Sequence, residues 1–257
     1  DSPRATDGSM DSMETIFYGA SPMSPARLQE GLEKWGQVFY QFFGQSECPM
    51  VIANMRKQDH DLAKPERLAS CGRPTPWVHM ALLDGDGKPV PDGEPGEICV
   101  RGPLVMAGYK DMPEQTAEAF AGDWLHTGDV GRLDEDGFLY IVDRTKDMIV
   151  TGGFNVFPRE VEDVLATHEA VAQVVVIGVP DDKWGEAVKA VVVPKPGAET
   201  SDTLVAELQA LVKDAKGSVQ APKSVDFVEA IPLTPVGKPD KKAVRALYWE
   251  GADRGVG

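Results

Sequence analysis

Four short segments of the sequence combine polar side chains with glycine in a way that suits nucleotide chemistry. The first, FGQSE at residues 43–47, places the hydroxyl of Ser46 and the carboxylate of Glu47 together after a run of apolar residues. Such oxygens can hold a phosphate oxygen and a hard cation, because Mg²⁺ prefers oxygen ligands. A plain turn with polar tips is the alternative, and on composition alone it is the commoner of the two.

The second segment, WLHTGD at residues 124–129, ends in a carboxylate directly after glycine. We expect Asp129 to lie in a loop, where a carboxylate can accept hydrogen bonds from a vicinal diol such as that of ribose. A capping aspartate is at least as common an interpretation. His126 taken alone favours a structural role.

The third segment, at residues 143–155, contains Arg144, which we expect to end a strand, and the glycine pair Gly152-Gly153. A guanidinium fork can reach ribose or phosphate, and paired glycines permit close approach of a thin substrate chain. A charged turn and an ordinary hairpin are the alternatives. In the fourth segment, Lys238 stands between Gly237 and Pro239. A mobile lysine there could serve as a point charge for a pyrophosphate leaving group, and an ordinary surface lysine is the alternative.

Regular elements must position these segments. In the first part of the chain, apolar and β-prone runs alternate with turn signals and with one helix that begins at Ser24-Pro25. We predict strands over residues 15–18, 38–43, 96–102 and 137–144. After Arg144, helices and strands alternate regularly. Here we predict strands over 171–179, 187–193 and 225–228, and helices over 158–167, 204–212 and 241–248.

Composition narrows the possible function classes. The formal net charge of −15 argues against nucleic acid as a partner, because phosphate backbones need a basic footprint. The three cysteines show no CxxC spacing, which disfavours structural zinc or a disulfide framework and suits a reducing, cytoplasmic compartment. No apolar run is long enough for a transmembrane segment, and residues 1–4, DSPR, predict no secretory signal.

The order and combination of these segments resemble the adenylate-forming superfamily of acyl-CoA synthetases, peptide adenylation domains and luciferases. The resemblance runs from about Glu14 to Leu247 and also rests on GEICVRGP at 96–103 and on Gly108-Tyr109. It implies an α/β (α+β) fold. Residues 1–143 would be the β-rich carboxy-terminal part of the large adenylation domain, and residues 144–257 the small mobile domain, with its hinge near Lys146.

The resemblance also implies roles for residues in the first part of the chain. Phe43, with Phe42 as an adjacent competitor, would stack on the adenine beside Gly44. Tyr18, Gly19 and Ala20 would belong to the segment, continuing through Ser21-Pro22, that lines the adenine and acyl pockets. Ser46 would touch phosphate, and Glu47 would help hold Mg²⁺.

Further along the chain, the resemblance implies that Asp129 and Arg144 bind the ribose of ATP or AMP. Lys238 would be the catalytic lysine between the carboxylate and the α-phosphate. Rotation about Lys146 would replace Lys238 by the Gly152-Gly153 loop, which would guide the pantetheine arm of CoA. The sequence GGFN at 152–155 is closer to acyl-CoA synthetases than to peptide adenylation domains.

Two departures from the family pattern stand out. The phosphate-binding loop, which normally lies well upstream of Tyr18, has no counterpart, so we expect the chain alone to be inactive. Val219-Gln220 stands where many relatives have Tyr-Lys, so one CoA-facing cation is missing unless Lys216 or Lys223 compensates.

We therefore interpret the chain as part of an ATP-dependent ligase for a carboxylic acid and CoA. The uncharged segment at residues 18–22 favours a fatty acid over an aromatic or alicyclic acid. Two alternatives are a carrier-protein thiol as the acceptor, and a nucleotide-binding or interaction module without turnover. A homodimer is a further possibility.

Overall fold

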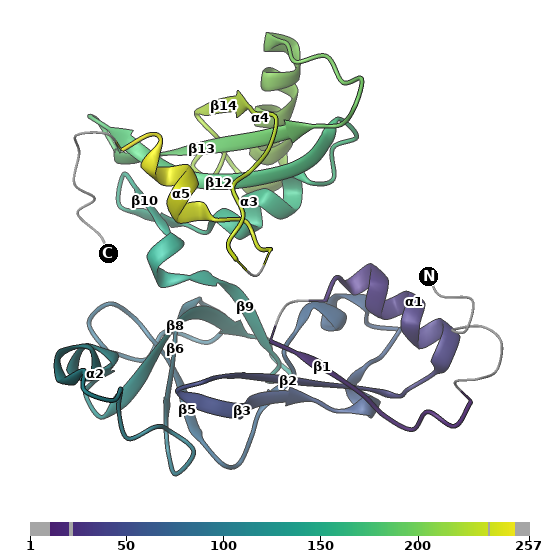
Figure 1. The fold of residues 1–257 in the computed structure, drawn as a ribbon, viewed down its shortest axis with the longest axis vertical. Helices are drawn as coiled ribbons and strands as arrows, with labels where there is room; N and C mark the ends of the chain where they lie inside the picture. The colour runs from purple at the N-terminus through teal and green to yellow at the C-terminus, as the bar shows by residue number, and fades with distance from the viewer. Residues whose placement is uncertain (1–10, 21–22, 236, 250–257) are drawn as a thin grey trace. The chain divides into compact units, whose positions relative to one another are not determined.

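The computed structural model describes residues 11–20, 23–235 and 237–249 (Figure 1). The chain divides into two compact units, residues 1–141 and residues 142–257. Both units combine helices with sheets, so the predicted α/β fold class is confirmed.

The first sheet of the first unit has the strand order β1-β2-β3-β4. Its strands are β1 (Ile16–Gly19), β2 (Phe39–Gln45), β3 (Cys48–Met55) and β4 (Arg73–Pro74). β1 and β2 are parallel, and the helix α1 (Pro25–Trp35) connects them, whereas β2 and β3 form an antiparallel hairpin. Two short 3₁₀ helices, η2 (Lys57–Asp59) and η3 (Pro65–Ala69), lie between β3 and β4.

The helix α1 begins where the sequence predicts it. The Ser24 side chain accepts a hydrogen bond from the Arg27 backbone amide, and Pro25 takes the first helical position. Leu28 and Leu32 are buried on one face of α1, where they pack with Phe39 of β2. This cluster anchors the start of β2, and the candidate site lies at the other end of that strand.

The second sheet has the strand order β5-β6-β8-β7, with β9 paired to β8. Its strands are β5 (His79–Leu83), β6 (Gly96–Arg101), β7 (Phe120–Ala121), β8 (Trp124–Leu133) and β9 (Leu139–Arg144), and the helix α2 (Pro113–Ala119) precedes β7. Ile98, Val100, Leu125 and Leu139 of this sheet share a core cluster with Phe43 of the first sheet. The two sheets are therefore joined near the carboxyl end of β2.

The second unit is built on a sheet with the order β11-β10-β13-β12, and β14 also pairs with β13. Its strands are β10 (Ile149–Thr151), β11 (Phe154–Val156), β12 (Val171–Asp181), β13 (Gly185–Pro194) and β14 (Ser224–Phe227). A 3₁₀ turn, η4 (Thr145–Asp147), precedes β10. The helices are α3 (Pro158–Leu165), α4 (Asp202–Lys216) and α5 (Lys241–Ala246).

The valine-rich runs of β12 and β13 are buried on both faces of this sheet. Val176 and Val188 pack in one cluster with residues of α3 and α4. Val175 and Ile177 point the other way and pack with Val244 of α5, which Figure 1 shows in yellow in front of the sheet. Two-sided burial explains why these strands are almost continuously apolar instead of alternating.

The structure changes some of the sequence-based predictions. Residues 124–129 do not form a loop, because they belong to the ten-residue strand β8. The predicted helix over 204–212 is part of the longer α4, and the strand β2 continues through Gly44. The elements β3 and α2 were not predicted, and β10 and β11 form the hairpin that stood as an alternative for residues 143–155. Among the described residues, no helix has the length and apolarity required to cross a membrane.

Candidate functional site

The carboxyl end of β2 turns tightly into β3 and presents the first candidate segment. Gln45 pairs with Cys48, so Ser46 and Glu47 form a two-residue turn. A Cβ atom on Gly44 would lie 2.9 Å from the Met50 carbonyl carbon, so only glycine fits without a shift. Ser46 is exposed and Glu47 is half-buried. The hydroxyl and the carboxylate therefore stand side by side at the tip of a constrained hairpin.

Glu47 is fixed from a neighbouring loop. Its carboxylate oxygen Oε1 accepts a hydrogen bond of 2.8 Å from the Tyr109 hydroxyl, and its backbone oxygen accepts one of 2.7 Å from the Met106 amide. The hydrogen bond to Glu47 is the main cause that raises the pKa of Tyr109. Tyr109 is one of the residues on which the family resemblance rests. It orients the carboxylate that we expect to bind Mg²⁺.

Asp129 lies at a wide bulge in β8. Glu97 of β6 pairs with Val130 and Cys99 pairs with His126, so residues 127–129 together face only Ile98. Gly128 has φ +70°, a conformation that favours glycine. Asp129 itself is 7% exposed. The bulge therefore holds Asp129 in a buried position within the sheet.

Gln45 joins the hairpin to the bulge. Its amide nitrogen Nε2 donates hydrogen bonds of 2.8 Å both to the Thr127 carbonyl and to Asp129 Oδ2. Two segments that lie more than 80 residues apart in the sequence are thereby brought into direct contact. Neither Gln45 nor Tyr109 was among the predicted site residues.

The two adjacent phenylalanines of β2 face opposite sides. Phe43 is 9% exposed and belongs to the core cluster between the two sheets. Phe42 is half-buried and stacks on the exposed Phe17 ring, with ring centroids 5.3 Å apart. Because Phe43 has so little exposed surface, little of this residue is open to an adenine in this arrangement.

The Tyr18 side chain points into the first unit. Its hydroxyl lies 2.9 Å from His60 Nε2, and its ring packs against the cluster around Leu28. Gly19 lies close to β2, since a Cβ atom there would be 2.3 Å from the Phe42 carbonyl oxygen. Ala20 is exposed with φ +60°, and Ser21 and Pro22 lie outside the described residues. Among residues 18–20, Ala20 is therefore the one with an exposed side chain.

In the second unit, the expected hinge residue Lys146 is exposed within η4. Arg144, also exposed, ends β9 as predicted. The Asp143 carboxylate accepts hydrogen bonds from the backbone amides of Arg144, at 2.7 Å, and of Arg159, at 2.8 Å. These bonds tie the Arg144 backbone to the start of α3.

Gly152 and Gly153 form the turn between β10 and β11, with φ +57° and +82°. A Cβ atom on Gly152 would lie 2.6 Å from a ring carbon of Trp184, whereas one on Gly153 would meet nothing within 4 Å. Phe154 and Trp184 beside the turn are 60% and 45% exposed. The ordinary hairpin is thus present, and its aromatic surroundings could also bind a thin apolar chain.

Lys238 is exposed on a compact loop before α5. The Thr234 amide donates to the Lys238 carbonyl at 2.7 Å, and the Lys238 amide donates to Thr234 Oγ1 at 3.1 Å. Leu233 and Pro239 close the loop by an isolated bridge. Val236 lies outside the described residues.

Two lysines could replace the missing CoA-facing cation, and the ammonium group of each already contacts an acceptor within the chain. Lys216 Nζ lies 3.2 Å from Glu160 Oε1, and Lys223 Nζ donates to the Ser218 carbonyl at 2.8 Å. Val219 is exposed and Gln220 is half-buried.

Comparisons with known proteins assign the family. The model of the family described as "AMP-binding enzyme" matches residues 2–110. That described as "AMP-binding enzyme C-terminal domain" matches residues 160–238, so the two together match more than half of the chain. The chain belongs to the adenylate-forming superfamily.

Among curated members of this superfamily, the chain is 58% identical over 261 residues to a medium/long-chain-fatty-acid–CoA ligase of Mycobacterium tuberculosis. That match covers 100% of this chain and 45% of the relative. A fatty acid–[acyl-carrier-protein] ligase of Streptomyces coeruleorubidus is 36% identical, over 95% of this chain and 46% of that protein. The chain thus spans about half the length of the curated relatives it matches.

Solved structures of adenylate-forming enzymes share the fold. ATP-bound MatB from Rhodopseudomonas palustris superposes with a TM-score of 0.81 at 33% identity, over 96% of this chain and 48% of that one. The amide bond synthetase McbA from Marinactinospora thermotolerans gives a TM-score of 0.78 at 42% identity, over 91% and 46%.

The donor set of the first unit fits the groups that an adenylate-forming enzyme binds. Ser46 and Glu47 supply only oxygen atoms, and Mg²⁺ sites commonly use one or two carboxylates together with substrate phosphates. Asp129 is a carboxylate held in one orientation, as recognition of a diol requires. In this unit the structure brings Gly44, Ser46, Glu47 and Asp129 into one neighbourhood.

Proposed function

We propose that the protein carrying this chain ligates a fatty acid to CoA through an acyl-adenylate. The carboxylate oxygen attacks the α-phosphorus of ATP and pyrophosphate leaves. The CoA sulfur, having lost its proton, then attacks the acyl carbon and AMP leaves with its electron pair. The single observation that carries the proposal is the Gln45 side chain, which binds Asp129 and thereby joins a ribose-binding carboxylate to the phosphate-facing hairpin.

The chain's own residues would bind, orient and neutralise charge in this reaction. Asp129 would accept hydrogen bonds from the ribose hydroxyls, and Ser46 would donate one to a phosphate oxygen. Glu47, oriented by Tyr109, would contribute ligand oxygens to Mg²⁺, which would neutralise phosphate charge. Phe43 and residues 18–20 would line the adenine and acyl side.

We assign residues 1–143 to the carboxy-terminal part of the large domain and residues 144–257 to the small mobile domain. Lys238 would act in adenylation and the Gly152-Gly153 turn in thioester formation, after rotation about Lys146. Arg144 would contribute to ribose binding. The exposure of Lys238 and Lys146 supports this proposal, since both must change their surroundings between the half-reactions.

The relatives favour CoA and a fatty acid over the alternatives. The fatty-acid–CoA ligase is 58% identical, the carrier-protein ligase 36% and a feruloyl-CoA synthase of Amycolatopsis 40%. We propose the same order of preference for this protein, and a cytoplasmic location. A homodimer stays a prediction that sedimentation can check.

A chimaera tests the proposal. This chain would replace the matching half of the Mycobacterium tuberculosis ligase, and AMP release would be measured with fatty, aromatic and alicyclic acids. Each acid would be offered with CoA, with a holo carrier protein and with an amine. We expect turnover with a fatty acid and CoA. Turnover only with another acceptor, or AMP binding without any turnover, would refute it.

Lys238→Ala in the chimaera should abolish adenylation, by on the order of 10²–10³-fold for one lost charge on the reacting group. Thioester formation from a supplied acyl-adenylate should remain. Lys242→Ala, at an exposed lysine of α5, is the matched control and should behave as wild type. Equal loss of both half-reactions in Lys238→Ala would contradict the assignment.

A further inference from the structure

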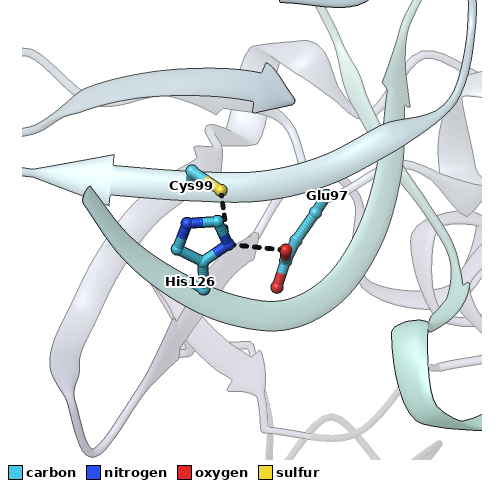
Figure 2. A group of neighbouring side chains, drawn as sticks. All are labelled: Glu97, Cys99 and His126. Carbon is cyan, nitrogen blue, oxygen red and sulfur yellow. Dashed lines mark hydrogen bonds and ion pairs between the residues drawn. The ribbon is translucent and has the colours of Figure 1, made fainter. Parts of the chain in front are cut away.

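A cluster of three side chains lies behind the bulge that carries Asp129. Figure 2 shows Glu97 and Cys99 on one strand, β6, and His126 on the neighbouring strand, β8, all pointing toward one another. Glu97 and Cys99 are two residues apart, so their side chains project from the same face of β6. None of the roles proposed above uses this cluster.

Both carboxylate oxygens of Glu97 contact residues at the bulge. Its Oε2 lies 2.7 Å from His126 Nδ1, and its Oε1 accepts a hydrogen bond of 3.0 Å from the Gly128 amide. Because residues 127–129 face only Ile98, their backbone groups cannot all pair with β6. An amide that is withdrawn from water and left without a partner is costly, and the Glu97 carboxylate satisfies the amide of the half-buried Gly128.

The other side of the bulge is held by two further side chains. Thr127 Oγ1 donates to the Ile98 carbonyl at 2.7 Å and accepts from the Asp129 amide at 3.2 Å. Gln45 donates to the Thr127 carbonyl and to Asp129 Oδ2. The bulge is therefore pinned at His126, Gly128 and Asp129, and Glu97 provides the first two of these contacts.

Two other uses of the cluster fit the geometry less well. In a Cys–His–Glu nucleophilic triad the thiol and the carboxylate engage different ring nitrogens, but here both lie nearest Nδ1, at 3.5 Å and 2.7 Å. In a metal site the ligand atoms would surround an ion, whereas here Glu97 and His126 contact each other directly. The N–O separation of 2.7 Å is that of a direct hydrogen bond.

We infer that Glu97 is a positioning residue that fixes the β8 bulge so that Asp129 can bind a ribose diol. This inference rests on the proposed function, because it assumes that Asp129 meets ribose. Glu97 acts through the His126 ring and the Gly128 backbone amide, and Asp129 is the residue that would meet the nucleotide. Its carboxylate is replaceable by an isosteric amide, which retains an acceptor for the Gly128 amide and a donor for an unprotonated His126 Nδ1.

The test compares two nucleotides on this chain. Dissociation constants for AMP and for 2′,3′-dideoxy-AMP, which lacks the diol, would be measured by ligand-observed NMR with wild type, Glu97→Ala, Glu97→Gln and Asp129→Asn. Wild type should prefer AMP by about tenfold or more, the effect of losing hydrogen bonds to a charged group. Asp129→Asn and Glu97→Ala should each lower that preference to near one, and Glu97→Gln should restore most of it.

Backbone hydrogen exchange separates positioning from folding. Exchange of the Gly128 amide should rise about tenfold or more in Glu97→Ala, while the amides of β12 in the second unit stay protected. If Glu97→Ala proves too unstable to purify, Thr127→Val, a substitution of nearly equal volume, takes its place. It should also reduce the preference for AMP.

The outcomes are distinct. A wild-type chain that binds both nucleotides equally removes the ribose assignment of Asp129, and the role of Glu97 falls with it. If wild type prefers AMP and both Glu97→Ala and Thr127→Val keep that preference, the role of Glu97 is overturned and the ribose assignment of Asp129 stands. Stoichiometric Zn²⁺ binding that is lost in Cys99→Ala would overturn it in favour of a metal site.

Discussion

An ion pair inside the second unit holds the helix that follows the Lys238 loop. Lys241 Nζ of α5 lies 2.9 Å from Glu162 Oε1 of α3, and their side chains are only 16% and 18% exposed. The same carboxylate oxygen accepts a hydrogen bond of 2.8 Å from the Val176 amide. Burial raises the pKa of Glu162, and the ammonium of Lys241 opposes that rise.

Lys241→Met removes the charge and keeps most of the side-chain volume. Breaking a buried pair from one side leaves an uncompensated charge and typically costs about 3–5 kcal/mol. We expect about 3 kcal/mol of lost unfolding free energy, the lower end of that range, because Glu162 keeps the Val176 amide and can take up a proton. In Lys241→Met the pKa of Glu162 should rise further.

The pH dependence has a definite sign. A carboxyl whose folded-state pKa is raised is penalised when ionised, so the penalty is full above that pKa and disappears as pH falls below its unfolded value. The cost of Lys241→Met should therefore be largest at neutral pH and smaller near pH 5. Protonation of Glu162 removes the charge that Lys241 had compensated.

Urea unfolding followed by hydrogen exchange of β12 and β13 peptides measures this cost for the second unit alone. Lys242→Met, at the exposed neighbouring lysine, is the control and should cost less than about 0.5 kcal/mol. Adding Glu162→Leu to Lys241→Met should recover much of the loss. Equal costs for the two lysine variants, or an unchanged cost between pH 8 and pH 5, would refute the reasoning.

Three further outcomes are expected. Gly153 has φ +82°, and an added Cβ would meet no atom within 4 Å, so Gly153→Val should lower the unfolding free energy by roughly 1–2 kcal/mol through backbone strain. In the chimaera this variant should slow CoA transfer but not adenylation. Unchanged transfer would count against the proposed role. His60 is fully buried and burial lowers its pKa, so the first unit should lose stability as pH falls below about 6.5, where the unfolded chain takes up the proton first. His60→Gln should show a smaller loss between pH 7.5 and 5.5 in urea titrations, and parallel curves would disprove this. Tyr18→Phe removes the hydroxyl 2.9 Å from His60 Nε2 and should cost about 1–2 kcal/mol, measured in the same titrations; a neutral effect would contradict it.

Much of the second unit could be predicted because burial leaves a direct trace in its sequence. The valine runs of β12 and β13 are apolar on both faces, and Pro158 marks the start of α3 at its first helical position. Such signals depend on the local chain alone. The short hairpin β10–β11 carries no comparable run of residues, so sequence analysis offered it only as an alternative.

The candidate site was only partly predictable, because its geometry depends on long-range pairing. Gln45 lies between Gly44 and Ser46 and reads as a polar tip, and its partner Asp129 is 84 positions away. Glu97 interrupts an apolar strand, which was the available signal for its role. Which of Phe42 and Phe43 faces outward follows from the register of β2, and sequence alone does not determine that register.

The size of the β8 bulge has a consequence for how the sheet tolerates change. Three residues opposite one amount to two additional residues, an even number, so positions 125 and 131 on either side of the bulge belong to the same face of the sheet. Removing two residues would preserve the inside–outside alternation of β8, whereas removing one would invert it for every residue beyond. Asp129 thus stands in an insertion of even length, which can be shortened or lengthened by two residues without inverting the faces of the rest of β8.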